Sequence, residues 1–424
     1  MLATIRNFAV AACVAATLAA DAVTFEECFA DTTVRLDYIL GGNAEHPAVS
    51  LLSTYRTPRW HGRREHTDRL PVDGNGTLTV TDDVSGDTIY RHSFSTLYSE
   101  WLTLGDTVCR AFENSFLMPM PRRKAHVTLS LTDSRHRETV RHTHPFDPAD
   151  ILIADLRPSG YKQVALHTGT YDGPKIGVAI LPEGFTAERM DIFMDYARKT
   201  VDAIFSHEPF GSMADRFDFI AVQVPSATQG VSVPKNGEWR DTPFGSHFST
   251  FYSDRYLTAP RVFDMYDAMA GVPAQHIIVL ADTDVYGGGG IYNSYTLTTT
   301  GNPKFSPVVV HEFGHSFGGL GDEYFYDNDV MTDTYPLDVE PWEPNITTLV
   351  NFPAKWQHLL AADTPVPTPA GTDVSVGVFE GGGYSSKGIY RPADVCRMRV
   401  NNVDAFCPAC QDWLRKLILF YTQK

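Results

Sequence analysis

The sequence predicts an α+β protein of more than one domain, with an all-β sandwich followed by an α/β domain. Two observations carry this prediction. A chain of 424 residues is longer than most single domains, so two or three domains are the ordinary expectation. The pattern of the chain also changes near residues 155–160, from short alternating runs to longer strand and helix signals. We therefore place the two domains at residues 23–157 and 158–424.

The first domain is predicted to consist of short strands. Thr77-Leu78-Thr79-Val80 and Val127-Thr128-Leu129-Ser130-Leu131 alternate between polar and apolar residues, and turn-forming clusters at 73–76 and 85–87 separate such runs. No convincing stretch has the period of a helix. Short strands divided by turns are typical of two packed sheets, so a two-sheet sandwich is the expected form.

The second domain is predicted to alternate strands and helices. Apolar residues recur at three- and four-residue spacing between Met190 and Ile204, which predicts an amphipathic helix. Continuous apolar runs predict buried strands at 176–181, 217–224 and 276–281, and a final helix is expected over about 410–421. This order of elements is typical of an α/β layout.

Residues 1–22 have the pattern of an export signal. Arg6 precedes the apolar run from Phe8 to Ala20, and Ala20-Asp21-Ala22 has the form of a cleavage site. The run is too short to span a bilayer, and no other apolar stretch approaches that length. We therefore expect a secreted, periplasmic or cell-surface protein without a transmembrane segment.

The net charge of −16 argues against a nucleic-acid partner, because such a partner requires a basic face. The sequence gives no indication of the oligomeric state.

Five cysteines remain after the predicted cleavage. Cys28 and Cys109 could pair, and we expect a disulfide from Cys396 to Cys407 or Cys410. The spacing of Cys407 and Cys410 could also be half of a zinc site, but a zinc site needs more thiols than the neighbouring sequence offers.

The strongest local signal is His311-Glu312-Phe313-Gly314-His315. Ser306 is expected to cap a helix that begins at Pro307, and the spacing of Val309, Phe313 and Phe317 makes one face of it apolar. Histidines four residues apart lie about 40° apart around a helix and about 6 Å apart along it. The two imidazoles can therefore bind one metal ion.

Glu312 is expected to be the general base of this site. Zinc lowers the pKa of a water molecule that it binds to about 7, and a neighbouring carboxylate can accept the proton as the water attacks a carbonyl. This residue pattern therefore predicts zinc-dependent hydrolysis of a protein or peptide.

A third metal ligand is expected just after this helix. Gly318, Gly319 and Gly321 allow a sharp turn, and two acidic residues follow them. In the extended zinc motif the third ligand lies ten residues after the first histidine, where this chain has Gly321. Asp322 is the nearest candidate and Glu323 the second, and either could instead be a surface or capping carboxylate.

Two further segments are candidates for roles near the metal. Met398 could lie in a tight turn beneath the metal, as in peptidases with the extended motif, or could be an ordinary core methionine. Gly288, Gly289 and Gly290 could allow a substrate backbone to lie along a sheet edge, or could form a loose turn.

The segment HEFGHSFGGLGDEY at 311–324 resembles the signature of the zinc peptidase family named after bacterial IgA peptidase. Further blocks resemble the same family and extend the resemblance over nearly the whole mature chain: 35–38, 99–101, 180–185, 207–210, 254–256, 286–293 and 388–392.

The resemblance implies an N-terminal β domain followed by a metzincin-like catalytic domain. It implies one zinc ion bound by His311, His315 and Asp322, with Glu312 as general base and Met398 in the Met-turn. The substrate does not follow from the resemblance, and no residue supports an immunoglobulin hinge in particular. An extracellular, host glycoprotein substrate is an open prediction.

Two other functions remain as alternatives. One is a glycoprotein-binding surface module with a vestigial zinc helix, which need not hold a metal ion. The other is a zinc amidase that acts on cell-wall peptides, which substrate profiling would identify.

Overall fold

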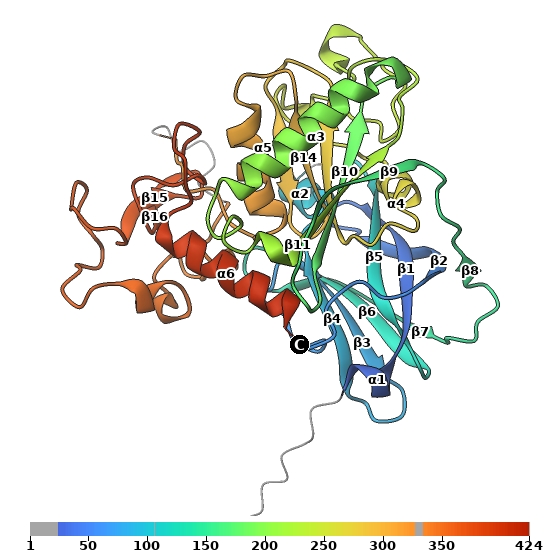
Figure 1. Ribbon diagram of the computed structural model, residues 1–424. Helices are drawn as coiled ribbons and strands as arrows, with labels where there is room; N and C mark the ends of the chain where they lie inside the picture. The colour runs from blue at the N-terminus through green and yellow to red at the C-terminus, as the bar shows by residue number, and fades with distance from the viewer. Residues whose placement is uncertain (1–23, 106, 327–333, 424) are drawn as a thin grey trace, which may run out of the picture.

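The computed structural model describes residues 24–105, 107–326 and 334–423. The predicted export signal at 1–22 lies outside the described residues. In Figure 1 the N-terminal sheets, in blue to cyan, lie in the lower part of the view, and the sheet of the second domain lies above them. Among the described residues, no helix has the length and apolar character needed to cross a membrane.

The N-terminal part contains two four-stranded sheets, in the orders β5-β1-β2-β8 and β4-β3-β6-β7. Their strands are β1 (Phe29–Gly42), β2 (Ala48–Pro58), β3 (Gly76–Asp82), β4 (Thr88–Phe94), β5 (Arg110–Pro121), β6 (Ala125–Thr132), β7 (Glu138–Phe146) and β8 (Ala154–Asp155). Two short helices, α1 (Phe25–Cys28) and α2 (Leu97–Thr103), accompany them.

The two sheets share one apolar core, as the sequence predicts. Alternate residues of β3 and β6, such as Leu78 and Leu129, are buried together with Leu36 of β1 and Phe116 of β5. Because the period of a strand is two residues, each strand contributes one face to this core. The short helix α2 was not expected; the Thr96 side chain accepts a hydrogen bond from the Ser99 backbone N–H and caps it.

The second part is built on a six-stranded sheet with the order β13-β14-β12-β10-β11-β9. Its strands are β9 (Lys162–Thr168), β10 (Ile176–Glu183), β11 (Phe217–Gln223), β12 (His276–Ala281), β13 (Gly288–Ile291) and β14 (Tyr295–Thr299). The four inner strands are parallel, and the edge strands β9 and β13 are antiparallel to their neighbours.

The helices of this part are α3 (Met190–Phe205), α4 (Val262–Ala268), α5 (Phe305–Ser316) and α6 (Pro408–Thr422), and β15 (Phe379–Gly382) and β16 (Ser385–Arg391) form a separate hairpin. Short 3-10 turns lie at Ala187–Arg189, Ala214–Arg216, Pro234–Asn236, Thr250–Tyr252, Phe352–Ala354 and Gln357–Leu359. The three strands expected in this part, and the helices expected at 190–204 and about 410–421, are therefore confirmed within a few residues.

The central strand β10 has side chains in both cores of this part. Val178 and Ile180 pack with residues of α3, α5 and α6 on one face, and Ala179 and Leu181 pack with residues of α4 on the other. Leu97 of the N-terminal part joins the second core. The N-terminal part therefore contributes to the core on one face of the sheet, and α5 packs in the core on the opposite face.

Polar contacts also join the two parts. The buried Arg35 of β1 forms ion pairs with Asp37 at 2.7 Å and with Asp267 of α4 at 2.6 Å. Tyr256 donates a hydrogen bond to Glu100 at 2.6 Å. Because a buried charge is costly without partners, the Arg35 contacts favour a fixed arrangement of the two parts.

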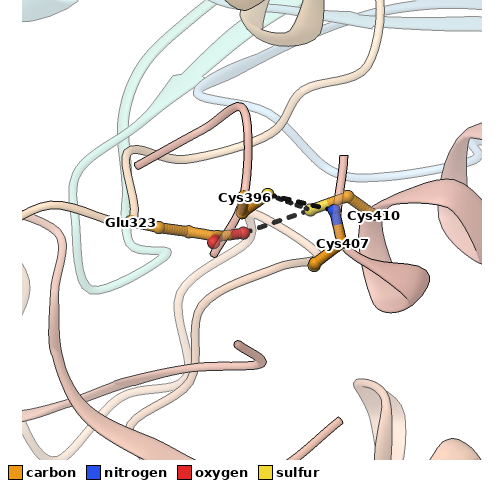
Figure 2. Close-up of side chains that lie close together, drawn as sticks. All are labelled: Glu323, Cys396, Cys407 and Cys410. Carbon is orange, nitrogen blue, oxygen red and sulfur yellow. Dashed lines mark hydrogen bonds between the residues drawn. The ribbon is translucent and has the colours of Figure 1, made fainter. Parts of the chain in front are cut away.

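The predicted disulfides are not formed. The cysteines of the described residues are all free thiols: Cys28, Cys109, Cys396, Cys407 and Cys410. The Sγ atoms of Cys396 and Cys410 lie 3.8 Å apart, well beyond the roughly 2.05 Å of a disulfide bond (Figure 2). The fold instead brings three thiols and the carboxylate of Glu323 together.

Candidate metal centre

Helix α5 carries His311, Glu312 and His315. The helix begins at Phe305 rather than Pro307, and its N-cap is Lys304, which has no side-chain capping hydrogen bond. The Lys304 backbone N–H donates to the Asn302 side chain at 2.9 Å just before the helix. The predicted cap at Ser306 is therefore wrong by two residues.

The apolar face of this segment is formed as expected. Val309, Phe313 and Phe317 are each no more than 1% exposed and pack in the same core as helix α3. This packing directs the opposite, half-buried side of α5 toward the site.

A sharp turn follows helix α5. Gly319 adopts a left-handed backbone conformation with φ of 61°, which costs little for glycine because it lacks a Cβ atom. The Gly319 N–H donates to the His315 carbonyl at 2.9 Å, and the Leu320 N–H donates to the Gly314 carbonyl at 3.1 Å. This turn returns the chain to the histidines at Asp322.

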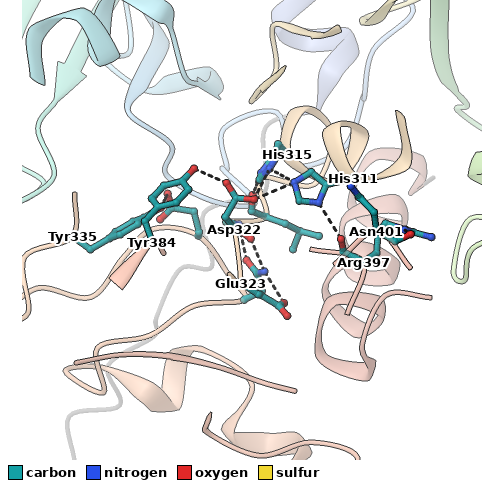
Figure 3. A network of polar contacts seen from close by, with 12 residues as sticks. His311, His315, Asp322, Glu323, Tyr335, Tyr384, Arg397 and Asn401 are labelled. Carbon is teal, nitrogen blue, oxygen red and sulfur yellow. Dashed lines mark hydrogen bonds and ion pairs between the residues drawn. The ribbon is translucent and has the colours of Figure 1, made fainter. Parts of the chain in front are cut away.

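Three donor atoms converge at this point (Figure 3). The Nε2 atoms of His311 and His315 lie 3.0 Å apart. Asp322 Oδ1 lies 3.0 Å from the first and 3.2 Å from the second. Nitrogen and oxygen ligands about 2.0–2.1 Å from a tetrahedral zinc ion are about 3.3–3.4 Å from one another, so the spacing fits a single small cation.

The far side of each ligand is held by a hydrogen bond. His311 Nδ1 lies 3.0 Å from the Arg397 carbonyl oxygen, and His315 Nδ1 lies 2.6 Å from the Leu320 carbonyl oxygen. Because a carbonyl only accepts, both Nδ1 atoms are donors and both Nε2 lone pairs face the centre. Tyr384 donates a hydrogen bond to Asp322 Oδ2 at 2.5 Å.

The charges of this cluster also favour a cation. Asp322 Oδ1 is buried, and apart from the two imidazole nitrogens no donor among the described residues satisfies it. Burial alone would raise the pKa of Asp322, but the imidazoles of His315 and His311 hold it well below its usual range. Burial alone would lower the pKa of His315, but the Asp322 charge raises it to about 9. A metal ion would replace the protons that bind here.

Glu312 lies beside this cluster, and burial raises the pKa of its carboxyl group. A carboxylate with a raised pKa is a better proton acceptor than an exposed one. The other acidic candidate, Glu323, does not join the histidines: its Oε1 accepts a hydrogen bond from the Asn345 side chain at 2.9 Å and lies 3.1 Å from Cys410 Sγ.

Met398 lies directly beneath the histidine helix. It is fully buried, and a Cβ atom added to Gly314 would lie only 2.7 Å from its Sδ atom. The Arg399 N–H donates to the Cys396 carbonyl at 3.0 Å, so Met398 lies in a tight turn. The same turn provides the Arg397 carbonyl that holds His311.

The three candidate glycines form the edge strand β13, which excludes a loose turn. A Cβ atom on Gly288 would lie 2.9 Å from Glu312 Oε1, and one on Gly290 would lie 2.2 Å from the Glu312 carbonyl oxygen. Gly289 has only ordinary contacts, the nearest at 3.6 Å. Glycines at 288 and 290 therefore allow the close approach of β13 to helix α5.

Several contacts of the site were not expected from the sequence. Tyr384 and the carbonyls of Leu320 and Arg397 hold the three converging side chains, and Asn345 holds the turn through hydrogen bonds with both the N–H and the carbonyl of Gly321. A carbonyl has no sequence signal, and Tyr384 is 62 residues from Asp322 in the chain. Only the Gly381-Gly382-Gly383 run before Tyr384 could have drawn attention to it.

The site combines a mixed sheet with a helix that carries two histidines and a glutamate. A turn after this helix places an aspartate beside both histidines. This combination is typical of the class of metallopeptidases. The family follows from comparison with family models. The model of the IgA peptidase M64 family matches residues 164–375, and that of the peptidase M64 N-terminus matches residues 24–143. The chain therefore belongs to the IgA peptidase M64 family and is a peptidase, a hydrolase that acts on proteins. No curated protein matched the chain.

Proposed function

We propose that the chain is a zinc-dependent endopeptidase with a metzincin-like catalytic domain. The observation that carries this proposal is the convergence of His311 Nε2, His315 Nε2 and Asp322 Oδ1 at 3.0–3.2 Å beside Glu312. Imidazole and carboxylate ligands in a tetrahedral arrangement favour zinc, and three protein ligands leave one position open for substrate or water, as in catalytic sites.

The residues have distinct roles in this proposal. His311, His315 and Asp322 hold the ion, and Met398 supports the helix beneath it. When bound, zinc polarises a carbonyl group and lowers the pKa of water to about 7. Glu312 accepts the proton of the attacking water at its carboxylate and delivers it to the leaving amine nitrogen.

The edge strand β13 is the proposed binding site for the substrate backbone. An extended peptide can add to a sheet edge through main-chain hydrogen bonds. Gly288, Gly289 and Gly290 have no side chains to obstruct this edge, and the first and third of them contact Glu312. The substrate would thus lie next to the general base. We propose an extracellular protein substrate, because residues 1–22 have the pattern of an export signal.

The substitution Glu312→Gln tests this mechanism. Glutamine cannot accept the proton, but it preserves the shape and the metal ligands. We expect unchanged metal content and a loss of kcat/KM on peptide substrates of about 10²–10⁴-fold. Metal analysis of the purified protein and cleavage of a peptide library measure the two effects.

The control is His315→Ala, which should lose one metal ion per chain relative to the unsubstituted protein. Full activity of Glu312→Gln would refute the proposed base. A chain that retains the same metal content after His315→Ala would instead support a binding module with a vestigial site. Cleavage confined to cell-wall peptides would identify an amidase.

A further inference from the structure

A second group of metal-binding side chains lies outside the centre described above. Glu323, Cys396, Cys407 and Cys410 are each no more than 3% exposed. One ligand atom from each, three sulfurs and one oxygen, lie within 4.8 Å of one another (Figure 2). None of these side chains has a role in the proposed hydrolysis.

The fold assembles this group from three separate segments. Cys407 is the N-cap of helix α6, and Cys410 lies in its first turn. Cys396 begins the tight turn that contains Met398, and Glu323 directly follows Asp322. The Cys407-Pro408-Ala409-Cys410 spacing is typical of zinc-binding thiols, and the fold provides the two further ligands that the local sequence lacks.

The distances fit a metal ion better than a disulfide. Two sulfur ligands about 2.3 Å from a tetrahedral zinc ion are about 3.8 Å apart. The Sγ atoms of Cys396 and Cys410 are 3.8 Å apart. A zinc-bound sulfur and carboxylate oxygen are about 3.5 Å apart by the same geometry, and Cys410 Sγ lies 3.1 Å from Glu323 Oε1.

The carboxylate of Glu323 gives an independent indication of a cation-binding site. Its Oε2 atom is buried and has no hydrogen-bond partner among the described residues. Oε1 accepts from Asn345 at 2.9 Å. A buried carboxylate oxygen without a donor or a cation is costly, and a disulfide between two of the thiols would leave that cost in place.

We propose that Glu323, Cys396, Cys407 and Cys410 bind a second, structural zinc ion. Thiolate ligands select soft or borderline ions, and four protein ligands leave no open position, as in structural zinc sites. The Cys407 backbone N–H donates to Cys396 Sγ at 3.3 Å, which stabilises a thiolate at that sulfur.

The second ion would stabilise the two turns that support the catalytic centre. It would join the Asp322 turn, through Glu323, to the Met398 turn, through Cys396, and both to helix α6. The two turns already contact each other, because the Glu323 N–H donates to the Met398 carbonyl at 2.9 Å. The ion would therefore hold Asp322 at a fixed distance from the Arg397 carbonyl that orients His311.

The unsubstituted full chain provides the first test. We expect two zinc ions per chain by elemental analysis. After exchange with Co²⁺, we expect a near-ultraviolet sulfur-to-cobalt charge-transfer band, which imidazole and carboxylate ligands do not produce. One ion per chain without this band would overturn the proposal, whatever the peptidase activity.

Single variants assign the band to the thiols. Cys407→Ser should lose the band and one zinc ion, whereas Cys28→Ser, which removes a buried thiol in the N-terminal part, should keep both. His315→Ala should lose the other ion and keep the band, so the two sites can fail independently. The final measurement distinguishes free thiols from a disulfide by alkylation of the protein in denaturant and chelator, without a reductant. Modification of Cys396, Cys407 and Cys410 supports the site. A disulfide among them overturns it.

Discussion

At the scale of single residues, the donor atoms of the centre are oriented by groups that do not touch the metal position. Both histidines contact backbone carbonyls through Nδ1, and Asp322 accepts a hydrogen bond from Tyr384. Such partners fix the orientation of a ligand, and the carbonyl oxygens also increase the basicity of the two histidines. Tyr384 is the one of these partners that a substitution can remove without altering the backbone.

We expect Tyr384→Phe to lower zinc affinity at the catalytic centre by about 10–100-fold, because Asp322 loses the hydrogen bond to its Oδ2 atom. Competition with a chelator measures the affinity. Tyr326→Phe is the matched control, since the Tyr326 ring stacks on Tyr384 at 6.4 Å and is 42% exposed. Equal affinities for the two variants would contradict this role of Tyr384.

At the scale of elements, the site depends on the contact between strand β13 and helix α5. Successive side chains of a strand point to opposite faces. Positions 288 and 290 therefore face the helix, and position 289 faces Tyr256 and Leu257. The three glycines are neighbours in the sequence, but only two of them are required by this packing.

We expect Gly290→Ala to destabilise the protein by about 1–3 kcal/mol or more and to reduce activity strongly, because its Cβ atom would lie 2.2 Å from the Glu312 carbonyl oxygen and 2.7 Å from His315 Cβ. Gly289→Ala should have little effect on stability, since its nearest contacts are at 3.6 Å. Urea unfolding and kcat/KM measure both variants. Similar losses of stability in both would show that the helix contact is not the cause.

At the scale of the whole molecule, His276 at the start of β12 lies where several parts of the chain meet. Its ring packs against Phe317 and against Tyr421 of α6, with centroids at 5.0 and 5.8 Å. It also lines a cavity with N-terminal residues such as Arg63 and Tyr90. Burial lowers the pKa of His276 to about 4, because a charged imidazole would lose its hydration there.

The sign of the resulting pH dependence follows from the lowered pKa. Above about pH 7.5, well above the ordinary histidine pKa of about 6.5, neither the folded nor the unfolded state protonates His276, so the full stability is present. Between about pH 6.5 and 4 the unfolded state binds a proton and the folded state does not. Stability is therefore lost as the pH falls, by about 2 kcal/mol at about pH 5.

We expect His276→Gln to reduce this acid sensitivity. Its unfolding free energy should fall by about 2 kcal/mol less than that of the unsubstituted protein between about pH 7.5 and pH 5. Denaturant unfolding at the two pH values measures the difference, and effects of metal release cancel between the proteins. The control is His46→Gln on an exposed loop, and an identical pH profile for His276→Gln and the unsubstituted protein would refute the prediction.

The elements that could be predicted are those whose residue pattern lies within the element itself. The helix at 190–205 was predicted because its apolar residues repeat with the period of a helix, and the buried strand at 276–281 was predicted from one continuous apolar run. The predicted start of α5 was wrong by two residues, because the N-cap is Lys304 and no side chain caps the first turn. A residue type that favours capping marks a possible helix start, but the tertiary packing sets where the helix begins.

The sequence by itself determined the chemistry of the proposed site. His311, Glu312 and His315, and the glycines and acidic residues that follow them, all lie within one helix and one turn. Their residue types and spacing are therefore a local signal. Only the tertiary structure decided which acidic residue meets the histidines and which meets the thiols. Asp322 and Glu323 are adjacent in the sequence, yet the side chain of the first meets the histidines and that of the second meets the thiols. Cys410, one of these thiols, is 87 residues from Glu323 along the chain. Contacts of that range are set by the packing of α6 and the Met398 turn against α5, which no local pattern encodes.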